Sequence, residues 1–227
     1  SSGEIDNVVL EPDISALGPG EYHCTLIITD PNAINSPRTI LVALSVGCVR
    51  DVPSATYPTI QSAIDASSDG DVVLVADGNY YEHDLDFDGR AITVKSENGP
   101  QSCIIDCTDN GRGFYFGNYE KHSSILDGFT IQNGNALDAR GDDCGGGIYI
   151  TEASPVIRNC DFNSCEGVLF GGAIYVQGST AILSNCDFRN NAADKGGGMY
   201  NHVSRPMVTH CAFTNNTATY DGGGMFN

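Results

Sequence analysis

A run of alternating carboxylates is the first feature of this 227-residue chain that could bind a ligand. Residues 83–89 read HDLDFDG and contain three aspartates, Asp84, Asp86 and Asp88. Carboxylate oxygens suit Ca²⁺, and an EF-hand loop starts with this D-x-D-x-D-G form. Its twelfth position must be a carboxylate, and here it is Lys95. Alternation instead predicts a strand with Leu85 and Phe87 inward and a solvated acidic face, with a surface calcium site as the alternative.

A second group of carboxylates lies in a long insertion. Between Phe129 and the next glycine triplet there are 15 residues, against 8, 7 and 8 in the three later copies of the same pattern. The excess, NALDARGDDC, contains a second set of calcium candidates, Asp138, Asp142 and Asp143. It ends at Cys144, and Cys165 replaces an asparagine of the pattern on the same edge of the next copy. A disulfide between Cys144 and Cys165 would pin this loop, and it is favoured over two unrelated thiols.

Cysteines and phenylalanines recur in register along the second half of the chain. The members of this ladder are Cys160, Cys186, Cys211, Phe162, Phe188 and Phe213, with successive steps of 26 and 25 residues. Aligned residues on stacked coils lie ~4.8 Å apart, further than the ~3.8 Å between the Cβ atoms of a disulfide. A metal would need histidine or carboxylate partners inside an apolar core. We therefore expect free, buried thiols that act as small apolar side chains.

A glycine motif keeps the same period, which identifies the architecture. The residues that follow the glycines, Ile148, Ile174, Met199 and Met225, are separated by 26, 25 and 26 residues. A fixed period of this length indicates a solenoid. Helical spacing is absent, and short alternating stretches such as PVIRNCDF and GGAIYV are punctuated by turn residues. These features predict a right-handed parallel β-helix with three strands per coil. Asn159 and Asn185, before the ladder cysteines, suit tight turns.

The first part of the chain predicts a cap and a different module. Residues 57–71, YPTIQSAIDASSDGD, form a short amphipathic helix that can close the first coil. Before it, EYHCTLIITD and PRTILVALSV alternate with period 2 and are joined by PNAINS, which indicates a hairpin. With NVVLEPDIS they give three strands, too few to be stable alone. The predicted fold is all-β: residues 1–48 end an immunoglobulin-like sandwich, and residues 49–227 form a β-helix.

Composition excludes several classes of partner. The net charge of −18 argues against nucleic acid and against an anionic membrane surface. No apolar run reaches the ~20 residues of a spanning helix, so no membrane insertion is expected. Nine cysteines favour an oxidising compartment outside the cytoplasm.

The two ends of the sequence suggest a longer protein. The chain starts without methionine, and it stops at Asn227 directly after a glycine motif. We expect further coils to follow. A coil left uncovered there would expose backbone hydrogen-bonding groups, which predicts end-to-end self-association through the C-terminal coil.

The repeat resembles that of a known protein family. The pattern F-x-x-N followed by G-G-[AG]-[IM]-[YF] is similar to the repeat of chlamydial polymorphic outer-membrane proteins and of bacterial secreted right-handed β-helix proteins. Residues 188–200 and 213–226 match it in full, whereas 162–175 has Cys165 in place of the asparagine. The segment YPTIQSAIDASSDGDVVLVADGNYYE resembles the first turn of carbohydrate-active β-helix proteins, including pectinesterases. Residues 20–46 resemble the end of a BACON-type sandwich module.

The resemblance implies a function outside the cell. It suggests a structural or adhesive region of a bacterial secreted or surface protein that contacts glycans or other surface proteins. A carbohydrate-active enzyme, a lyase or an esterase, is the alternative. A pectinesterase-like site would need two outward aspartates and an arginine at one place. The candidates are Asp106, Asp127, Asp161, Asp187, Arg158 and Arg189, which form no motif in the sequence, so we assign no catalytic residue and no cofactor other than calcium.

Overall fold

A computed structural model describes residues 17–29, 36–137 and 143–227. The chain divides into two compact units, Ser1–Gly47 and Cys48–Asn227. In the first unit, β1 (Gly20–Ile28) pairs antiparallel with β2 (Arg38–Val46), in a register that sets Gly20 opposite Val46. The segment NVVLEPDIS and most of PNAINS lie outside the described residues. The described part of this unit is one two-stranded sheet, so the immunoglobulin-like sandwich stays a prediction.

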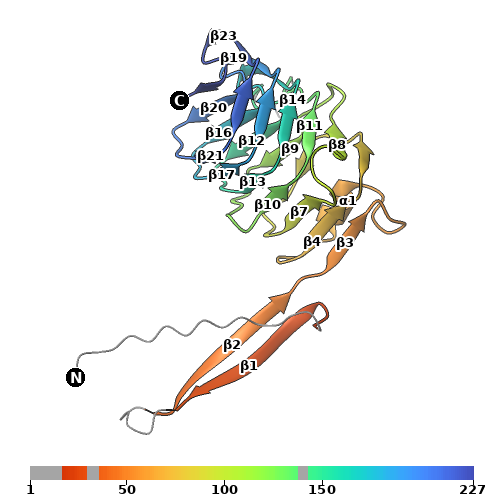
Figure 1. Cartoon of the computed structure of the whole chain (residues 1–227), viewed down its shortest axis with the longest axis vertical. Coiled ribbons are helices and arrows are strands. Elements are labelled where there is room, and N and C mark those ends of the chain that lie inside the picture. Colours follow the sequence, from red (N-terminus) through yellow and green to blue (C-terminus); the bar gives the residue numbers. More distant parts are fainter. Residues whose placement is uncertain (1–16, 30–35, 138–142) are drawn as a thin grey trace, which may run out of the picture. The chain divides into compact units, whose positions relative to one another are not determined.

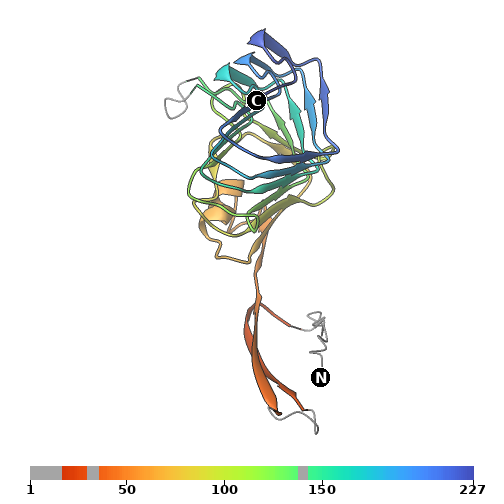
Figure 2. The ribbon, with the colours of Figure 1, turned by 90° about the vertical axis from the view of Figure 1, so that its left-hand side faces the viewer.

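The second unit is a parallel β-solenoid, which confirms the predicted fold class (Figure 1). Its coils lie one above another in Figure 2, and each coil after the first contributes one strand to each of three long sheets. We call these sheets I, II and III, in the order in which a coil passes through them. A fourth, three-stranded sheet IV forms between sheets II and III in the last coils.

Sheet I has seven parallel strands, one from each coil. They are β3 (Val49–Val52), β4 (Val72–Val75), β7 (Thr93–Ser96), β10 (Ile125–Asp127), β13 (Val156–Arg158), β17 (Ile182–Ser184) and β21 (Met207–Thr209). Sheet II has six strands, β5 (Gly78–Tyr80), β8 (Cys103–Asp106), β11 (Thr130–Gln132), β14 (Asp161–Asn163), β18 (Asp187–Arg189) and β22 (Ala212–Thr214).

Sheet III also has six strands. They are β6 (Leu85–Asp86), β9 (Phe114–Phe116), β12 (Ile148–Thr151), β16 (Ile174–Gln177), β20 (Met199–His202) and β24 (Met225–Phe226). Sheet IV consists of β15 (Glu166–Phe170), β19 (Ala192–Lys195) and β23 (Thr217–Asp221).

The helix α1 (Ile60–Asp65) packs against β3, β4 and β6 at the start of the solenoid. It is shorter than the predicted 57–71, because Thr59 caps its first turn in a capping box with Ser62 and the helix ends at Ala66. Its apolar face, Ile60, Ala63 and Ile64, is buried as the sequence predicts. Among the described residues α1 is the only helix, and it is too short to cross a membrane.

The solenoid interior is filled by the ladder residues. The rings of Phe162 and Phe188 are stacked with centroids 5.0 Å apart, and those of Phe188 and Phe213 are 4.4 Å apart. Both Cys160 and Cys186 are fully buried in the same core. Stacking of identical side chains on successive coils follows directly from the in-register pairing of β14, β18 and β22.

Turn chemistry explains why each coil bends where it does. Asn159, Asn185 and His210 all have φ near +54°, a left-handed conformation that asparagine tolerates. The first glycine of each triplet is also left-handed, for example Gly196 at φ +64°. A Cβ atom at the second glycine, Gly172, would lie 2.2 Å from the carbonyl oxygen of Gly197. The motif is therefore required for backbone conformation and for close stacking of coils.

An aromatic column runs along the outer side of sheet III. The ring that ends each glycine motif points outward, and the members of this column are Tyr115, Tyr149, Tyr175, Tyr200 and Phe226. Successive centroids lie 5.7, 5.0, 5.8 and 5.2 Å apart. Phe170 of sheet IV packs 4.6 Å from Tyr200, and the guanidinium of Arg112 lies 4.8 Å from the Tyr149 ring. The column is a second, outer apolar cluster.

Candidate functional site

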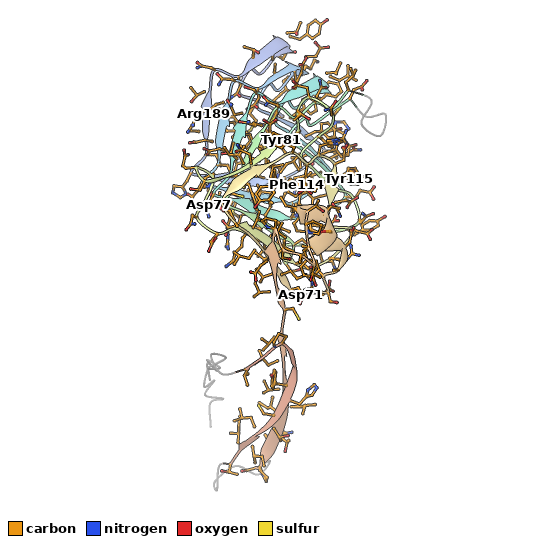
Figure 3. The ribbon with its side chains drawn as sticks, turned by 90° about the vertical axis from the view of Figure 1, so that its right-hand side faces the viewer. Asp71, Asp77, Tyr81, Phe114, Tyr115 and Arg189 are labelled. Carbon is orange, nitrogen blue, oxygen red and sulfur yellow. The ribbon has the colours of Figure 1, made fainter. Side chains whose placement is uncertain are left out.

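The outer face of sheet II carries two rows of side chains, because alternate residues of each strand point away from the core. One row contains Asn79, Ile104, Thr130, Asp161, Asp187 and Ala212. The other contains Asp106, Gln132, Asn163, Arg189 and Thr214. Tyr81 follows β5 directly and is 70% exposed. Figure 3 labels Tyr81 and Arg189 on the solenoid. We call these two rows with Tyr81 the sheet II face.

Two aspartates and one arginine converge on the sheet II face. Asp161 and Asp187 are in-register neighbours on β14 and β18. The guanidinium of Arg189 contacts the Asp187 carboxylate, and its Nη1 lies 3.9 Å from Oδ2 of Asp161. From the loop before β8, Gln101 Nε2 donates to the same Oδ2 over 3.1 Å. The strand register and the loop before β8 together assemble residues that are 60 positions apart in the sequence.

The two carboxyl groups have different surroundings. Partial burial raises the pKa of Asp161; Arg189 and Gln101 act in the opposite direction, and the negative charge of Asp187 adds to the rise. The side chain of Asp161 is 16% exposed and that of Asp187 is 36% exposed. Asp161 therefore holds a proton to higher pH than an ordinary aspartate, while Asp187 lies in direct contact with a guanidinium.

Further along the face, hydrogen bonds connect neighbouring coils. Gln132 and Asn133 donate to the carboxylate of Asp106 over 2.8 and 2.9 Å. Burial acts to raise the pKa of Asp106, but these bonds and the Thr108 amide hold it below its usual value. Asn190 donates to Oδ1 of Asn163 over 2.9 Å. Amide side chains have four hydrogen-bonding sites, so this ordered row can still bond a ligand.

The remaining catalytic candidates lie on another sheet. Asp127 belongs to β10 of sheet I, where Arg158 Nε donates to its Oδ2 over 2.8 Å and Asn159 donates to its Oδ1 over 2.7 Å. Its carboxylate connects the coils of sheet I. The structure brings together Asp161, Asp187 and Arg189, and it separates Asp127 and Arg158 from them.

The first group of calcium candidates is held by protein partners. Leu85 and Phe87 are buried, as the alternation predicts. Each of the three carboxylates has a different partner. His83 Nδ1 lies 2.8 Å from the Asp84 carboxylate, and the backbone amide of Asp88 donates to the Asp86 carboxylate over 2.8 Å. Arg90 Nη1 donates to the Asp88 carboxylate over 3.2 Å. Within the described residues, no three acidic, histidine or cysteine side chains are grouped to hold a metal ion. Asp138 and Asp142 lie outside the described residues, and Asp143 alone of that group is described.

The predicted disulfide between Cys144 and Cys165 is absent from the structure. Cys165 is a free thiol that points into the main core, with its Sγ 3.6 Å from the carbonyl oxygen of Ile131. Cys144 packs instead with Tyr149 and Tyr175 of the aromatic column. The prediction placed Cys165 on the edge that carries the long loop, whereas this position of the repeat faces inward.

Two hollows of the described surface lie away from the sheet II face. One of about 250 Å³ follows sheet IV across Glu166, Ala193 and Thr217, and one of about 570 Å³ lies beside Arg205 and Met225. The sheet II face is an open surface, which suits an extended ligand better than a small enclosed one.

Sequence reasoning missed Gln101 and the meeting of Asp161 with Arg189. The 26-residue step from Asp161 to Asp187 equals the ladder period and was a usable signal for adjacency. The position of Gln101 had no such signal, because it depends on how the loop at 97–102 folds onto sheet II.

Comparison with known proteins identifies one match. A family model described as a right-handed β-helix region matches residues 83–226, more than half of the chain. No curated protein and no solved structure matches.

Proposed function

Because the chain belongs to the right-handed β-helix family, we propose that it is a structural and adhesive region of a bacterial secreted or surface protein. In this proposal the solenoid is a rigid support, and the sheet II face contacts an extended glycan. The location outside the cell is supported by the resemblance of the repeat to secreted proteins.

The polar row of the sheet II face is the observation that carries this proposal. Asp106, Gln132, Asn163 and Arg189 occupy one outward position on four successive strands. Their spacing of ~4.8 Å is close to the length of one sugar residue in an extended polysaccharide, so successive sugars can meet successive side chains. Tyr81 offers an exposed ring on which the apolar face of a sugar can stack.

The negative charge of the chain limits the class of glycan that the sheet II face can bind. The chain carries −18, and the sheet II face contains three carboxylates against one guanidinium, so a polyanionic polysaccharide would be repelled. Neutral or amino-sugar polymers are the expected ligands.

A glycan array is the direct test, run in calcium and then in chelator. We expect binding to neutral or amino-sugar polymers, and Tyr81→Ala should weaken it by about tenfold or more. Tyr220→Ala is the matched control, because Tyr220 is 69% exposed but lies on β23 of sheet IV. Equal loss in both variants, or no binding to any polymer, would contradict the proposed face. A signal that disappears only in chelator would identify calcium as a cofactor.

A second candidate function is hydrolysis of a glycan at Asp161 and Asp187. The observation that favours it is the pair of neighbouring carboxyls with different surroundings, which is the arrangement that separates an acid from a base or nucleophile. Assays with neutral glycosides and acetylated sugars test it, with Asp161→Asn and Asp187→Asn as variants. Turnover that survives both substitutions would exclude this site.

A further inference from the structure

The outer face of sheet I differs in chemistry from the sheet II face. One of its two outward rows is apolar at six of seven positions, and its members are Val49, Val72, Thr93, Ile125, Val156, Ile182 and Met207. Val49 is 59% exposed and Met207 is 58% exposed, and the members between them are partly exposed. Seven strands ~4.8 Å apart make an apolar stripe roughly 29 Å long. A contiguous stripe of this kind indicates an interaction surface.

Charges of alternating sign border the stripe. In the second outward row, Lys95, Asp127 and Arg158 stand on the three consecutive strands β7, β10 and β13. Lys95 and Arg158 are exposed, and the side chain of Asp127 is 18% exposed. The order along the solenoid is therefore positive, negative, positive.

We propose that this stripe binds a second copy of the same chain, with the two solenoids antiparallel. A two-fold axis parallel to the strands, between β10 and β13, sets Asp127 of each copy opposite Arg158 of the other. The same operation sets Ile125 against Val156 and Val72 against Met207. It also sets Thr93 against Ile182, and Val49 of each copy lies beyond the end of the other stripe. A parallel dimer packed stripe on stripe would leave the two charged rows on opposite sides of the interface, without these ion pairs. The charged row therefore favours the antiparallel arrangement.

Face-to-face packing of two sheets is geometrically reasonable here. Sheets pack ~10 Å apart with interdigitating side chains, and β-branched residues form most of this stripe. The stripe is narrow, so we expect an interface at the low end of the size range and a dissociation constant in the micromolar to millimolar range.

Sedimentation equilibrium of the whole 227-residue chain tests this proposal. From about 1 µM to about 1 mM we expect a monomer–dimer equilibrium. Ile125→Asp buries a charge in the interface and should raise the dissociation constant by about tenfold or more. Ile104→Asp is the matched control, because Ile104 holds an outward, partly exposed position on β8 of sheet II. The control should leave the equilibrium unchanged.

A charge exchange tests the orientation. Arg158→Asp alone should weaken the dimer, and Arg158→Asp together with Asp127→Arg should restore it, since both the internal and the intermolecular pairs are re-formed. A chain that stays monomeric up to about 1 mM overturns the proposal. A dissociation constant that is unchanged by Ile125→Asp also overturns the proposal and would indicate another contact surface, such as the last coil. Glycan binding by Tyr81 is measured separately and does not depend on either outcome.

Discussion

Asn191 and Asn216 meet inside the solenoid, where Nδ2 of Asn191 lies 2.9 Å from Oδ1 of Asn216 on the next coil. Asn191 also accepts the amide of Cys165 over 2.9 Å and donates to the carbonyl of Phe162 over 3.1 Å. It is fully buried. These asparagines belong to the F-x-x-N motif, and their side chains satisfy backbone groups that the turn leaves without strand partners.

Replacing Asn191 by leucine should destabilise the solenoid. The substitution leaves the Cys165 amide buried without its acceptor and removes the side-chain bond to the Phe162 carbonyl, and we expect a loss of about 2 kcal/mol in the free energy of unfolding. Urea denaturation followed by circular dichroism measures it. Asn190→Gly is the control, because Asn190 is exposed and has φ +56°, a conformation that glycine also adopts. Equal losses would show that the inner asparagines have no special role.

Restoring the motif at Cys165 should have the opposite effect. Cys165→Asn places an amide where Asn191 and Asn216 have theirs, within reach of the Ile131 carbonyl that the thiol now approaches at 3.6 Å. A stronger hydrogen bond should stabilise the chain by about 1 kcal/mol. The urea midpoint should rise; a lower midpoint would mean that this turn differs from the two later ones.

Acid should weaken the start of the solenoid through Asp71. Burial acts to raise the pKa of this carboxyl, but the amides of Ser68 and Cys48 and the guanidinium of Arg50 hold it below 3.8. A lowered pKa adds stability above the unfolded value, and this stability is lost as the pH falls from about 4 towards the folded value. Asp71→Asn should remove that part of the pH dependence. Unfolding free energies at about pH 6 and about pH 3 give the comparison, and an unchanged slope in the variant would contradict it.

Thiol labelling should follow burial. Burial raises the pKa of Cys160 and of Cys165 to about 12, and Cys186 is raised by its hydrogen bond to Cys211 and by burial. That hydrogen bond lowers the pKa of Cys211 below its usual value, and Cys211 is only partly buried. We therefore expect Cys211 to alkylate in the native protein and the other three to react only after unfolding. Mass spectrometry of the alkylated peptides identifies the labelled cysteines. Rapid labelling of Cys160 in the native protein would show that the core is open.

The periodic part of the fold was predictable because every coil must place apolar side chains in the same continuous interior. Phe162 and Phe188 must fill one continuous interior, so their spacing reveals the coil length. The arrangement of Asp161 with Gln101 was not predictable, since a loop outside the repeat supplies the second residue. The Cys144–Cys165 disulfide was wrong for a related reason: the repeat gives the period of Cys165, but the direction of its side chain depends on the turn.

The stacked coils also determine how the solenoid responds to force. Hydrogen bonds in the sheets run along the solenoid axis, so a pull along that axis loads the bonds between one coil and the next. Each coil, such as the 25 residues from Ile174 to Met199, can then peel away separately and release about 85 Å of chain. A tether built in this way lengthens in steps under tension, and the coils still stacked keep the geometry of their outer faces.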